Sequence, residues 1–303
     1  MSDANDLRGR VAVITGAGSG FGREFARLGA ARGMKLVLAD VQVDALQAVE
    51  SQLRAQGAQV LARIVDVADG AQVEQLALDT YAAYGAAHLL FNNAGVGSAG
   101  LIWENSERDW AWTLGVNLWG VIHGIRAFVP RMLEASKTSL EFSAHVVNTA
   151  SMAGLLNPPA SGVYNVSKHA VVALSETLYH DLSLVTDQVH CSVLCPFYVP
   201  TGIHASARNR PEDLANATPP TRSQRVAAAM VEKAVTSGKV SAEQVAAITF
   251  DAIAQRRFYI VSHPQALDGV RLRADDIVGL RNPTDPFSQR PALREQLVEA
   301  LRG

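Results

Sequence analysis

Short apolar runs alternate with longer amphipathic segments along the first two-thirds of the chain. The runs are rich in Val, Leu and Ile, which favours buried strands, and they span residues 11–15, 36–39, 60–64, 88–92, 145–149, 191–195 and 258–261. The segments between them have helical periodicity and span residues 22–32, 43–56, 71–84, 108–133 and 164–186. Strands that alternate with helices predict a single α/β domain, in which a doubly wound, seven-stranded parallel sheet is covered on both faces.

Two proline-containing regions interrupt this alternation. Residues 197–224 contain several prolines among polar residues, so we predict a loop with a short helical piece there. Because this stretch follows the sixth strand, it is a candidate substrate lid. Residues 263–303 contain further prolines and predict extended chain that ends in a short helix over 292–301. We therefore expect a catalytic domain over 1–262 and a C-terminal extension over 263–303, which packs on the body or on a neighbouring subunit.

Composition narrows the classes of partner. The net charge is −2, without the excess of basic residues that a nucleic-acid partner requires, so we expect no nucleic-acid partner. Residues 1–10 are polar and carry acids, unlike a signal peptide, and the apolar stretches are shorter than a membrane-spanning helix. We therefore expect a soluble, cytoplasmic protein without a membrane partner. Cys191 and Cys195 share one predicted strand, about 13 Å apart at the rise of a strand, so we interpret them as two buried thiols and not as a disulfide.

A glycine-rich turn follows the first predicted strand. Its sequence, Thr15-Gly16-Ala17-Gly18-Ser19-Gly20-Phe21-Gly22, precedes a helical segment, which is the context of a dinucleotide-binding Rossmann turn. Glycine lets the backbone approach a pyrophosphate, whose charge is stabilised by amide groups and the helix dipole. Gly16, Gly20 and Gly22 are our candidates. Glycines that serve only packing are the alternative interpretation of this turn.

Asp40 favours the dinucleotide interpretation. It stands at the end of the second predicted strand, where a carboxylate accepts hydrogen bonds from the adenosine ribose hydroxyls. A carboxylate there repels a 2′-phosphate, and the following residues, Val41, Gln42 and Val43, supply no cation. The sequence therefore predicts NAD as the cofactor in preference to NADP.

Several motifs between about residues 10 and 261 resemble those of the short-chain dehydrogenase/reductase family. The glycine turn is similar to TGxxxGxG, Asn92-Asn93-Ala94-Gly95 to the NNAG element, and Tyr164-Asn165-Val166-Ser167-Lys168 to the YxxxK signature. The resemblance implies a catalytic group of Asn117, Ser151, Tyr164 and Lys168. It extends the cofactor-binding candidates to Gly16, Ser19, Gly20, Phe21, Gly22, Asp40, Val41, Asp66, Val67, Asn93, Ala94, Gly95, Tyr164, Lys168, Pro196, Val199 and Thr201.

The chemistry of the four catalytic candidates supports this assignment. Alcohol oxidation with a nicotinamide needs a base for the hydroxyl proton, and the reverse reaction needs an acid. Tyr164 and Lys168 share one helix face, so the ammonium is expected to lower the pKa of the phenol and to hold the nicotinamide ribose. Ser151 would stabilise the substrate oxygen. The resemblance implies that Asn117 interrupts its helix and supports a proton relay.

The predicted mouth of the site is mostly apolar, which favours a hydrophobic aromatic or alicyclic substrate. The pocket candidates are Ser151, Met152, Leu156, Phe197, Tyr198 and Ile203. Phe197 departs from the family pattern, which usually has glycine after the proline. No pair among the eight histidines has the spacing and third ligand of a zinc site, so we predict no metal.

These patterns together predict an NAD-dependent oxidoreductase that interconverts a secondary alcohol and a ketone, an activity of the EC 1.1.1.- class. The alternatives are an NADPH-dependent carbonyl reductase and a dinucleotide-binding protein without turnover. The resemblance also implies a homodimer or homotetramer, built through the long helices predicted over 108–133 and 164–186.

Overall fold

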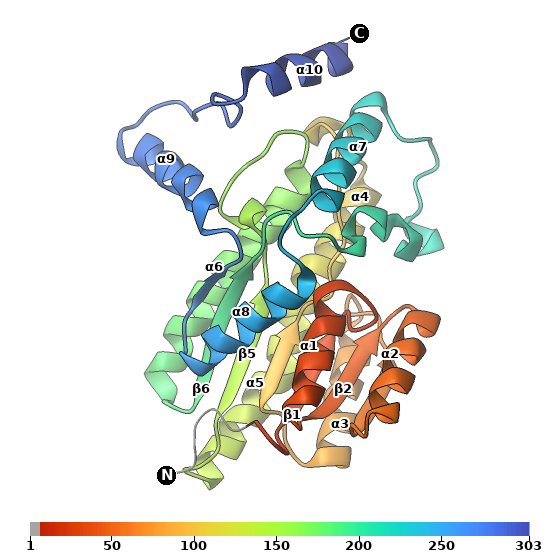
Figure 1. The fold of residues 1–303 in the computed structure, drawn as a ribbon, viewed down its shortest axis with the longest axis vertical. Coiled ribbons are helices and arrows are strands. Elements are labelled where there is room, and N and C mark those ends of the chain that lie inside the picture. The colour runs from red at the N-terminus through yellow and green to blue at the C-terminus, as the bar shows by residue number, and fades with distance from the viewer. Residues whose placement is uncertain (1–6, 303) are drawn as a thin grey trace.

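A parallel sheet of seven strands forms the centre of the computed structural model, which describes residues 7–302 (Figure 1). The strand order is β3-β2-β1-β4-β5-β6-β7. The strands are β1 (Val11–Thr15), β2 (Lys35–Asp40), β3 (Val60–Ile64), β4 (Leu89–Asn92), β5 (Ala144–Thr149), β6 (Val189–Cys195) and β7 (Tyr259–Val261). The predicted fold class is confirmed, and the order reverses between β1 and β4, which opens a crevice at their carboxyl ends.

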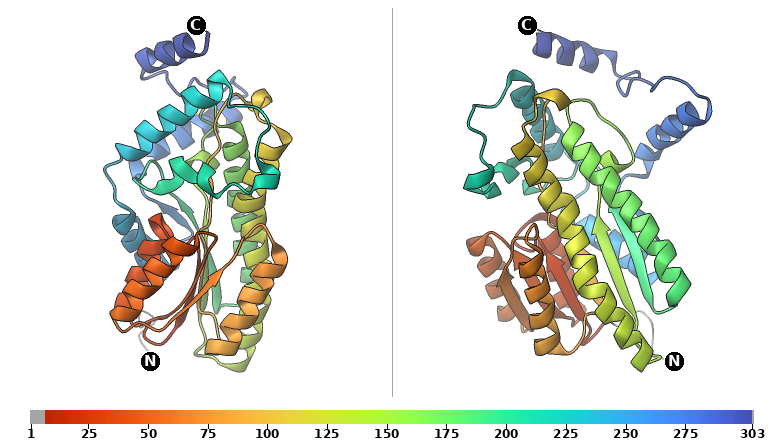
Figure 2. Two further views of the ribbon diagram at one scale, coloured as in Figure 1. Left: turned by 90° about the vertical axis from the view of Figure 1, so that its right-hand side faces the viewer. Right: turned by 180° about the vertical axis from the view of Figure 1, so that it is seen from behind.

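Helices cover both faces of this sheet (Figure 1, Figure 2). One face carries α1 (Gly20–Ala31), α2 (Val43–Ala55) and α8 (Ala242–Ala254), and the other carries α3 (Gly70–Tyr84), α5 (Gly120–Thr138) and α6 (Gly162–Val185). In β1, Ala12 and Ile14 pack in one core while Val11 and Val13 pack in the other. Because successive side chains of a strand point to opposite faces, a strand covered on both sides is a continuous apolar run.

The helix predicted over 108–133 is divided into three parts. α4 (Glu107–Leu114) is followed by a single π-helical turn, Gly115–Trp119, and then by α5. Asn117 lies in the π turn and is fully buried. A π turn inserts an extra residue into the helix, and such insertions often occur at functional sites. The interruption at Asn117 that the family resemblance implies is therefore present.

The proline-containing stretch after β6 is largely irregular, as predicted, with 3₁₀ helices at Gly202–Asn209 and Glu212–Leu214. We call residues 202–214 the lid segment. Two further helices, α7 (Arg222–Thr236) and α8, were not predicted from the sequence. Both begin with capping boxes, formed by Thr221 with Gln224 and by Ser241 with Gln244, which are local signals for a helix start.

The expectation of extended chain at the start of the C-terminal extension was wrong. α9 (Leu267–Val278) is helical, because Pro264 occupies the first position of the 3₁₀ turn Pro264–Ala266, where a missing N–H costs nothing. The terminal helix was predicted correctly and spans Pro291–Arg302 (α10). α10 lies beside α7 in both views of Figure 2, and Arg222 donates a hydrogen bond from Nε to Ala300 O (2.6 Å).

The sequence analysis predicts neither an export signal nor a membrane-spanning helix. The polar start, which predicts no export signal, falls mainly on residues 1–6 and so lies outside the described residues. Within residues 7–302, no helix combines the length and the apolar character needed to cross a membrane.

Candidate active site

The glycine-rich turn joins β1 to α1 at the crevice. Gly16 has a φ of +66° and Gly20 a φ of +52°, a backbone region that side chains disfavour. A Cβ at Gly22 would lie 2.1 Å from Gly16 O, so this glycine allows the helix to pack against the turn. Ser19, the N-cap of α1, makes no side-chain capping hydrogen bond. The first amide groups of α1 are therefore available to an anionic ligand.

Asp40 ends β2 beside this turn and is buried. Oδ2 accepts a hydrogen bond from Gly18 N (2.8 Å), and Oδ1 accepts one from Gln42 N (2.9 Å). Each carboxylate oxygen has two acceptor positions, so one on each oxygen remains for a ligand hydroxyl. The turn itself is braced by Asn93, whose Nδ2 donates to Thr15 O (2.9 Å).

Tyr164, Ser151 and Lys168 meet at the other end of the crevice. Ser151 hydrogen-bonds to the Tyr164 phenol, and Lys168 Nζ lies 5.7 Å from the centroid of the Tyr164 ring. Lys168 is 2% exposed and donates a hydrogen bond to Thr149 O (2.9 Å). Three of the four side chains that the sequence predicted as a catalytic group are thus close in space.

The pKa of the tyrosine differs from expectation. Burial raises the pKa of Tyr164 to about 12, although the hydrogen bond with Ser151 acts in the opposite direction. Burial also lowers the pKa of Lys168 to about 8. Desolvation therefore dominates, the phenol pKa is raised and not lowered as the spacing predicts, and the phenol is protonated at neutral pH.

Asn117 is held between the irregular segment that follows β4 and helix α6. Its Oδ1 accepts from Val96 N (2.8 Å), and its Nδ2 donates to Val96 O (3.0 Å) and to Ser167 Oγ (3.1 Å). A Cβ at Gly95 would lie 3.4 Å from Asn117 Oδ1 and 3.6 Å from Lys168 Nζ. Asn117 and Lys168 therefore both approach Gly95, at ordinary van der Waals distance from the position of a Cβ there.

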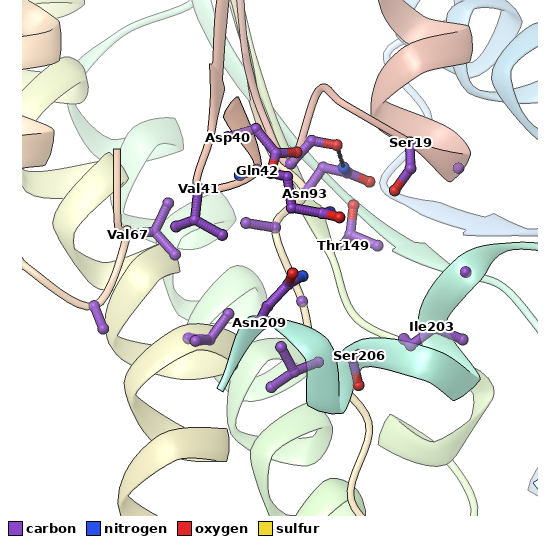
Figure 3. Close-up of a pocket in the computed structure, with 18 of the residues that line it drawn as sticks. Ser19, Asp40, Val41, Gln42, Val67, Asn93, Thr149, Ile203, Ser206 and Asn209 are labelled. Carbon is purple, nitrogen blue, oxygen red and sulfur yellow. Dashed lines mark hydrogen bonds between the residues drawn. The ribbon is translucent and has the colours of Figure 1, made fainter. Parts of the chain in front are cut away.

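A single cleft joins most of the predicted cofactor residues (Figure 3). Its lining includes Gly16, Ser19, Gly20, Phe21, Asp40, Val41, Asp66, Val67, Asn93, Ala94, Gly95, Tyr164, Lys168, Pro196 and Thr201. Gly22 and Val199 lie outside the lining, Gly22 against Gly16 and Val199 in the core under α1 and α8. The cleft therefore runs from the ribose carboxylate candidate to the candidate catalytic group.

The predicted substrate residues are more dispersed. Ile203 lines the cleft, but Met152 is 1% exposed and packs in the core between α6 and β6. Leu156 packs at the edge of that core and faces Gly269 on α9. Phe197 is not part of the cleft lining. The centroid of its ring lies 4.5 Å from that of Tyr198 and 5.8 Å from that of His263. The large side chain in place of the usual glycine thus leaves the cofactor cleft open.

The lid segment contributes cleft residues that the sequence did not identify. Figure 3 shows Ile203, Ser206 and Asn209 facing Asp40, Val41 and Gln42 across the cleft. Ser206 Oγ accepts from Gly97 N (2.8 Å), and Arg208 Nε donates to Gln42 Oε1 (2.9 Å). These pairs are far apart in the chain, so no local motif indicates them.

A buried ion pair fastens the lid segment to α4. Arg210 Nη1 lies 2.6 Å from Asp109 Oδ1, and the two side chains are 16% and 9% exposed. Asn216 Nδ2 donates to the same carboxylate oxygen (3.0 Å). Cζ of Arg210 lies 5.2 Å from the ring centroid of Trp112, which lines the cleft. This pair therefore links the lid segment to α4 next to a residue of the cleft wall.

The sheet order and the cleft at its reversal point define a Rossmann-like α/β protein. A family model described as short chain dehydrogenase matches residues 10–212. A 1-deoxy-11-beta-hydroxypentalenate dehydrogenase from Streptomyces exfoliatus is 34% identical over 297 residues, which cover 96% of this chain and 98% of that protein. The chain belongs to the short-chain dehydrogenase/reductase family and is an oxidoreductase.

Two solved structures extend the comparison. A short-chain dehydrogenase/reductase from Burkholderia phymatum, in complex with NAD, is 57% identical with a TM-score of 0.91, over 93% of this chain and 99% of that chain. A metagenomic short-chain oxidoreductase in complex with NADP is 31% identical with a TM-score of 0.58, over 63% of this chain and 83% of that chain.

Proposed function

We propose that this oxidoreductase interconverts a secondary alcohol and a ketone with NAD. The observation that carries the proposal is one cleft lined by Asp40 and by Tyr164 and Lys168, with Ser151 hydrogen-bonded to Tyr164 behind the lining. A dinucleotide joins an adenosine ribose to a nicotinamide through a pyrophosphate, and residues of the glycine turn line the same cleft.

The residues present fit the cofactor. The positive φ of Gly16 and Gly20 and the uncapped start of α1 leave amide groups for the pyrophosphate, and Asp40 retains acceptor positions for ribose hydroxyls. Lys168 would hold the nicotinamide ribose, and Thr201 would contact the carboxamide. When bound, the nicotinamide supplies the acceptor or donor of the hydride.

Tyr164 exchanges the proton of the substrate oxygen. Its high pKa keeps the phenol protonated at neutral pH, the form that donates to a carbonyl oxygen during ketone reduction. Ser151 donates to the same oxygen and stabilises its developing charge. In the oxidative direction, positive charge on Lys168 and on the oxidised nicotinamide favours the phenolate, so the same residue accepts the proton. Asn117, held by Val96 and Ser167, supports the relay beyond Lys168.

A hydrophobic substrate suits the surroundings of Tyr164. Tyr198, which pairs with Phe197, lies near the Tyr164 phenol, and Ile203 adds aliphatic surface to the cleft lining. A relative named for an 11-beta-hydroxy substrate, hydroxypentalenate, is consistent with an alicyclic secondary alcohol. We propose aromatic or alicyclic secondary alcohols as the substrate class.

We also propose that the chain forms a homodimer or homotetramer through α5 and α6. Trp119 at the start of α5 is 50% exposed, and Tyr179 on α6 is 44% exposed. Large aromatic side chains are enriched at subunit interfaces. A monomeric mass in light scattering at micromolar concentration would contradict this assembly.

The test is reduced-nicotinamide absorbance with NAD or NADP and a panel of aryl and alicyclic secondary alcohols. We expect Tyr164→Phe to lower kcat by about 100-fold or more, because a positioned acid or base contributes that much, while NAD still binds. Tyr84→Phe, at the end of α3 outside the cleft lining, is the matched control. Turnover with NADP alone would favour the carbonyl reductase alternative, and binding without turnover across the panel would favour a protein that only binds the dinucleotide.

A further inference from the structure

Charge is sparse in the cleft where the dinucleotide is proposed to bind. Among the residues that line it, the acids are Asp40 and Asp66, and the bases are Lys168 and Arg208. Lys168 lies beside Tyr164 at the catalytic end. Arg208 is therefore the cation that lines the cleft away from the catalytic group. It belongs to the lid segment, since the turn between β2 and α2 contains no lysine or arginine.

Hydrogen bonds place Arg208 next to the ribose carboxylate candidate. Its Nε donates to Gln42 Oε1 (2.9 Å), and the backbone of Gln42 donates to Asp40 Oδ1 (2.9 Å). Its Nη1 donates to Gly202 O (3.1 Å) and to Ala205 O (2.7 Å). The guanidinium is thus held in one orientation by both sides of the cleft, although the residue is exposed.

These bonds leave part of the guanidinium available. Arginine has five N–H donors in a planar fork. One on Nε and two on Nη1 are used by Gln42, Gly202 and Ala205. Within residues 7–302, Nη2 has no hydrogen-bond partner, and its two donors remain for a ligand oxygen. Paired donors of this kind match the geometry of a phosphate group.

We propose that Arg208 is a cofactor-specificity residue that allows a 2′-phosphorylated dinucleotide to bind despite Asp40. This inference rests on the proposed dinucleotide site. Asp40 alone places a negative charge against a 2′-phosphate, which carries between one and two negative charges at neutral pH. Arg208 offsets the charge of Asp40 at the same rim and donates to the phosphate through Nη2. NAD remains the preferred cofactor, because Asp40 still accepts from its ribose hydroxyls, and NADP becomes a second, weaker one.

Gln42 has an anchoring role in this arrangement. Its side chain caps no helix amide, although it stands at the N-cap of α2, and its Oε1 instead accepts from Arg208. Removing this acceptor frees the guanidinium to move with the exposed lid segment. The effect of a Gln42 substitution on NADP binding must therefore depend on the presence of Arg208.

The experiment measures dissociation constants of NAD and NADP by the quenching of protein fluorescence, without turnover. We expect Arg208→Gln to weaken NADP binding about tenfold, the loss of one partly exposed charge-assisted hydrogen bond. NAD binding should change less than about threefold, since NAD has no phosphate at that position. Added KCl should reduce the difference for NADP, because exposed charges are screened. Arg225→Gln, an exposed arginine on α7 that binds Pro220 O, is the matched control.

Gln42→Met provides the second variant. It should weaken NADP binding by a smaller factor, and combining it with Arg208→Gln should add nothing further. Equal weakening of NAD and NADP in Arg208→Gln, or no measurable NADP binding by the unsubstituted protein, would overturn the specificity role. Binding of neither cofactor would overturn the proposed function itself, and this inference with it.

Discussion

The ion pair between Asp109 and Arg210 allows a quantitative test of how the lid segment is held. Asp109 accepts hydrogen bonds from Arg210, from Asn216 and, through Oδ2, from the backbone of Ser106 (2.8 Å). The amide of an asparagine in this place has one acceptor oxygen and would direct N–H groups at one of these donors. Asp109→Asn therefore removes the charge opposite Arg210 and leaves at least one donor without an acceptor.

The expected cost follows from burial. Breaking a fully buried pair by changing one partner costs about 3–5 kcal/mol. Arg210 keeps its bonds to Leu214 O and Asn216 Oδ1, and its side chain is 16% exposed, so we expect a cost below this range, about 2 kcal/mol. At about 2–4 °C per kcal/mol, the midpoint of thermal unfolding should fall by about 4–8 °C.

Lowering the pH should remove the stability that the pair of Asp109 and Arg210 contributes. Burial alone would raise the pKa of Asp109, but hydrogen bonds from Arg210, Ser106 N and Asn216 outweigh it and lower the pKa. A carboxyl whose folded-state pKa is lowered adds stability above its unfolded pKa, and this stability is lost as pH falls through the folded value. The difference in midpoint between Asp109→Asn and the unsubstituted protein should therefore be constant near neutral pH and shrink below the usual range of an aspartate.

Differential scanning fluorimetry from acidic to neutral pH measures both effects. Glu134→Gln is the control, because its partner Lys137 and Glu134 itself are 68% and 73% exposed, and exposed pairs contribute little. If Asp109→Asn shifts the midpoint no more than Glu134→Gln does, the buried pair does not hold the lid segment, and the reasoning from its burial is refuted.

Three further predictions concern the glycine turn and Lys168. Gly22→Ala should abolish measurable NAD binding while the protein stays folded by circular dichroism, because the added Cβ would lie 2.1 Å from Gly16 O and must displace the turn; retained affinity would show that the turn does not contact the pyrophosphate. NAD affinity should fall as pH rises above about 8, where Lys168 loses its proton, and Lys168→Arg should remove this dependence because arginine stays charged. In the protein without cofactor, the lowered pKa of Lys168 means that the unfolded chain binds more protons between about 8 and the usual lysine value, so this residue makes stability rise with pH in that window. A pH-independent NAD affinity would exclude Lys168 as the ribose contact.

The sheet and its glycine turn could be predicted because their signals are local. Each strand is a short apolar run, and all seven strands occur within a few residues of their predicted bounds. Tyr164 and Lys168 are four residues apart on one helix, so their shared face follows from helical geometry. Helices α7 and α9 were missed for a different reason. The prolines before them were interpreted as helix breakers, whereas Pro264 starts a helical turn. In α9, several apolar side chains, such as Val278 at 85% exposure, do not face a core, so they give no amphipathic pattern.

Desolvation limits what spacing can say about the catalytic group. The four-residue spacing correctly placed Lys168 beside Tyr164, but it carried no information on burial. In the folded chain, burial raises the pKa of the phenol and lowers that of the lysine, which is the reverse of the coupling expected from charge alone. The spacing of the two side chains therefore does not fix the direction of their pKa shifts, because their burial is set by the tertiary structure.

Cofactor preference shows the same limit at the other end of the cleft. The β2 terminus alone, with Asp40 followed by uncharged residues, predicts that a 2′-phosphate is excluded. The fold adds Arg208, which is separated from Gln42 by 166 positions and reaches it only because the lid segment crosses the carboxyl ends of the strands. A polar pair at that separation has no periodicity or motif in the sequence. In the proposed site, discrimination between the two dinucleotides thus depends jointly on a strand end that the sequence identifies and on a segment that only the tertiary structure brings to it.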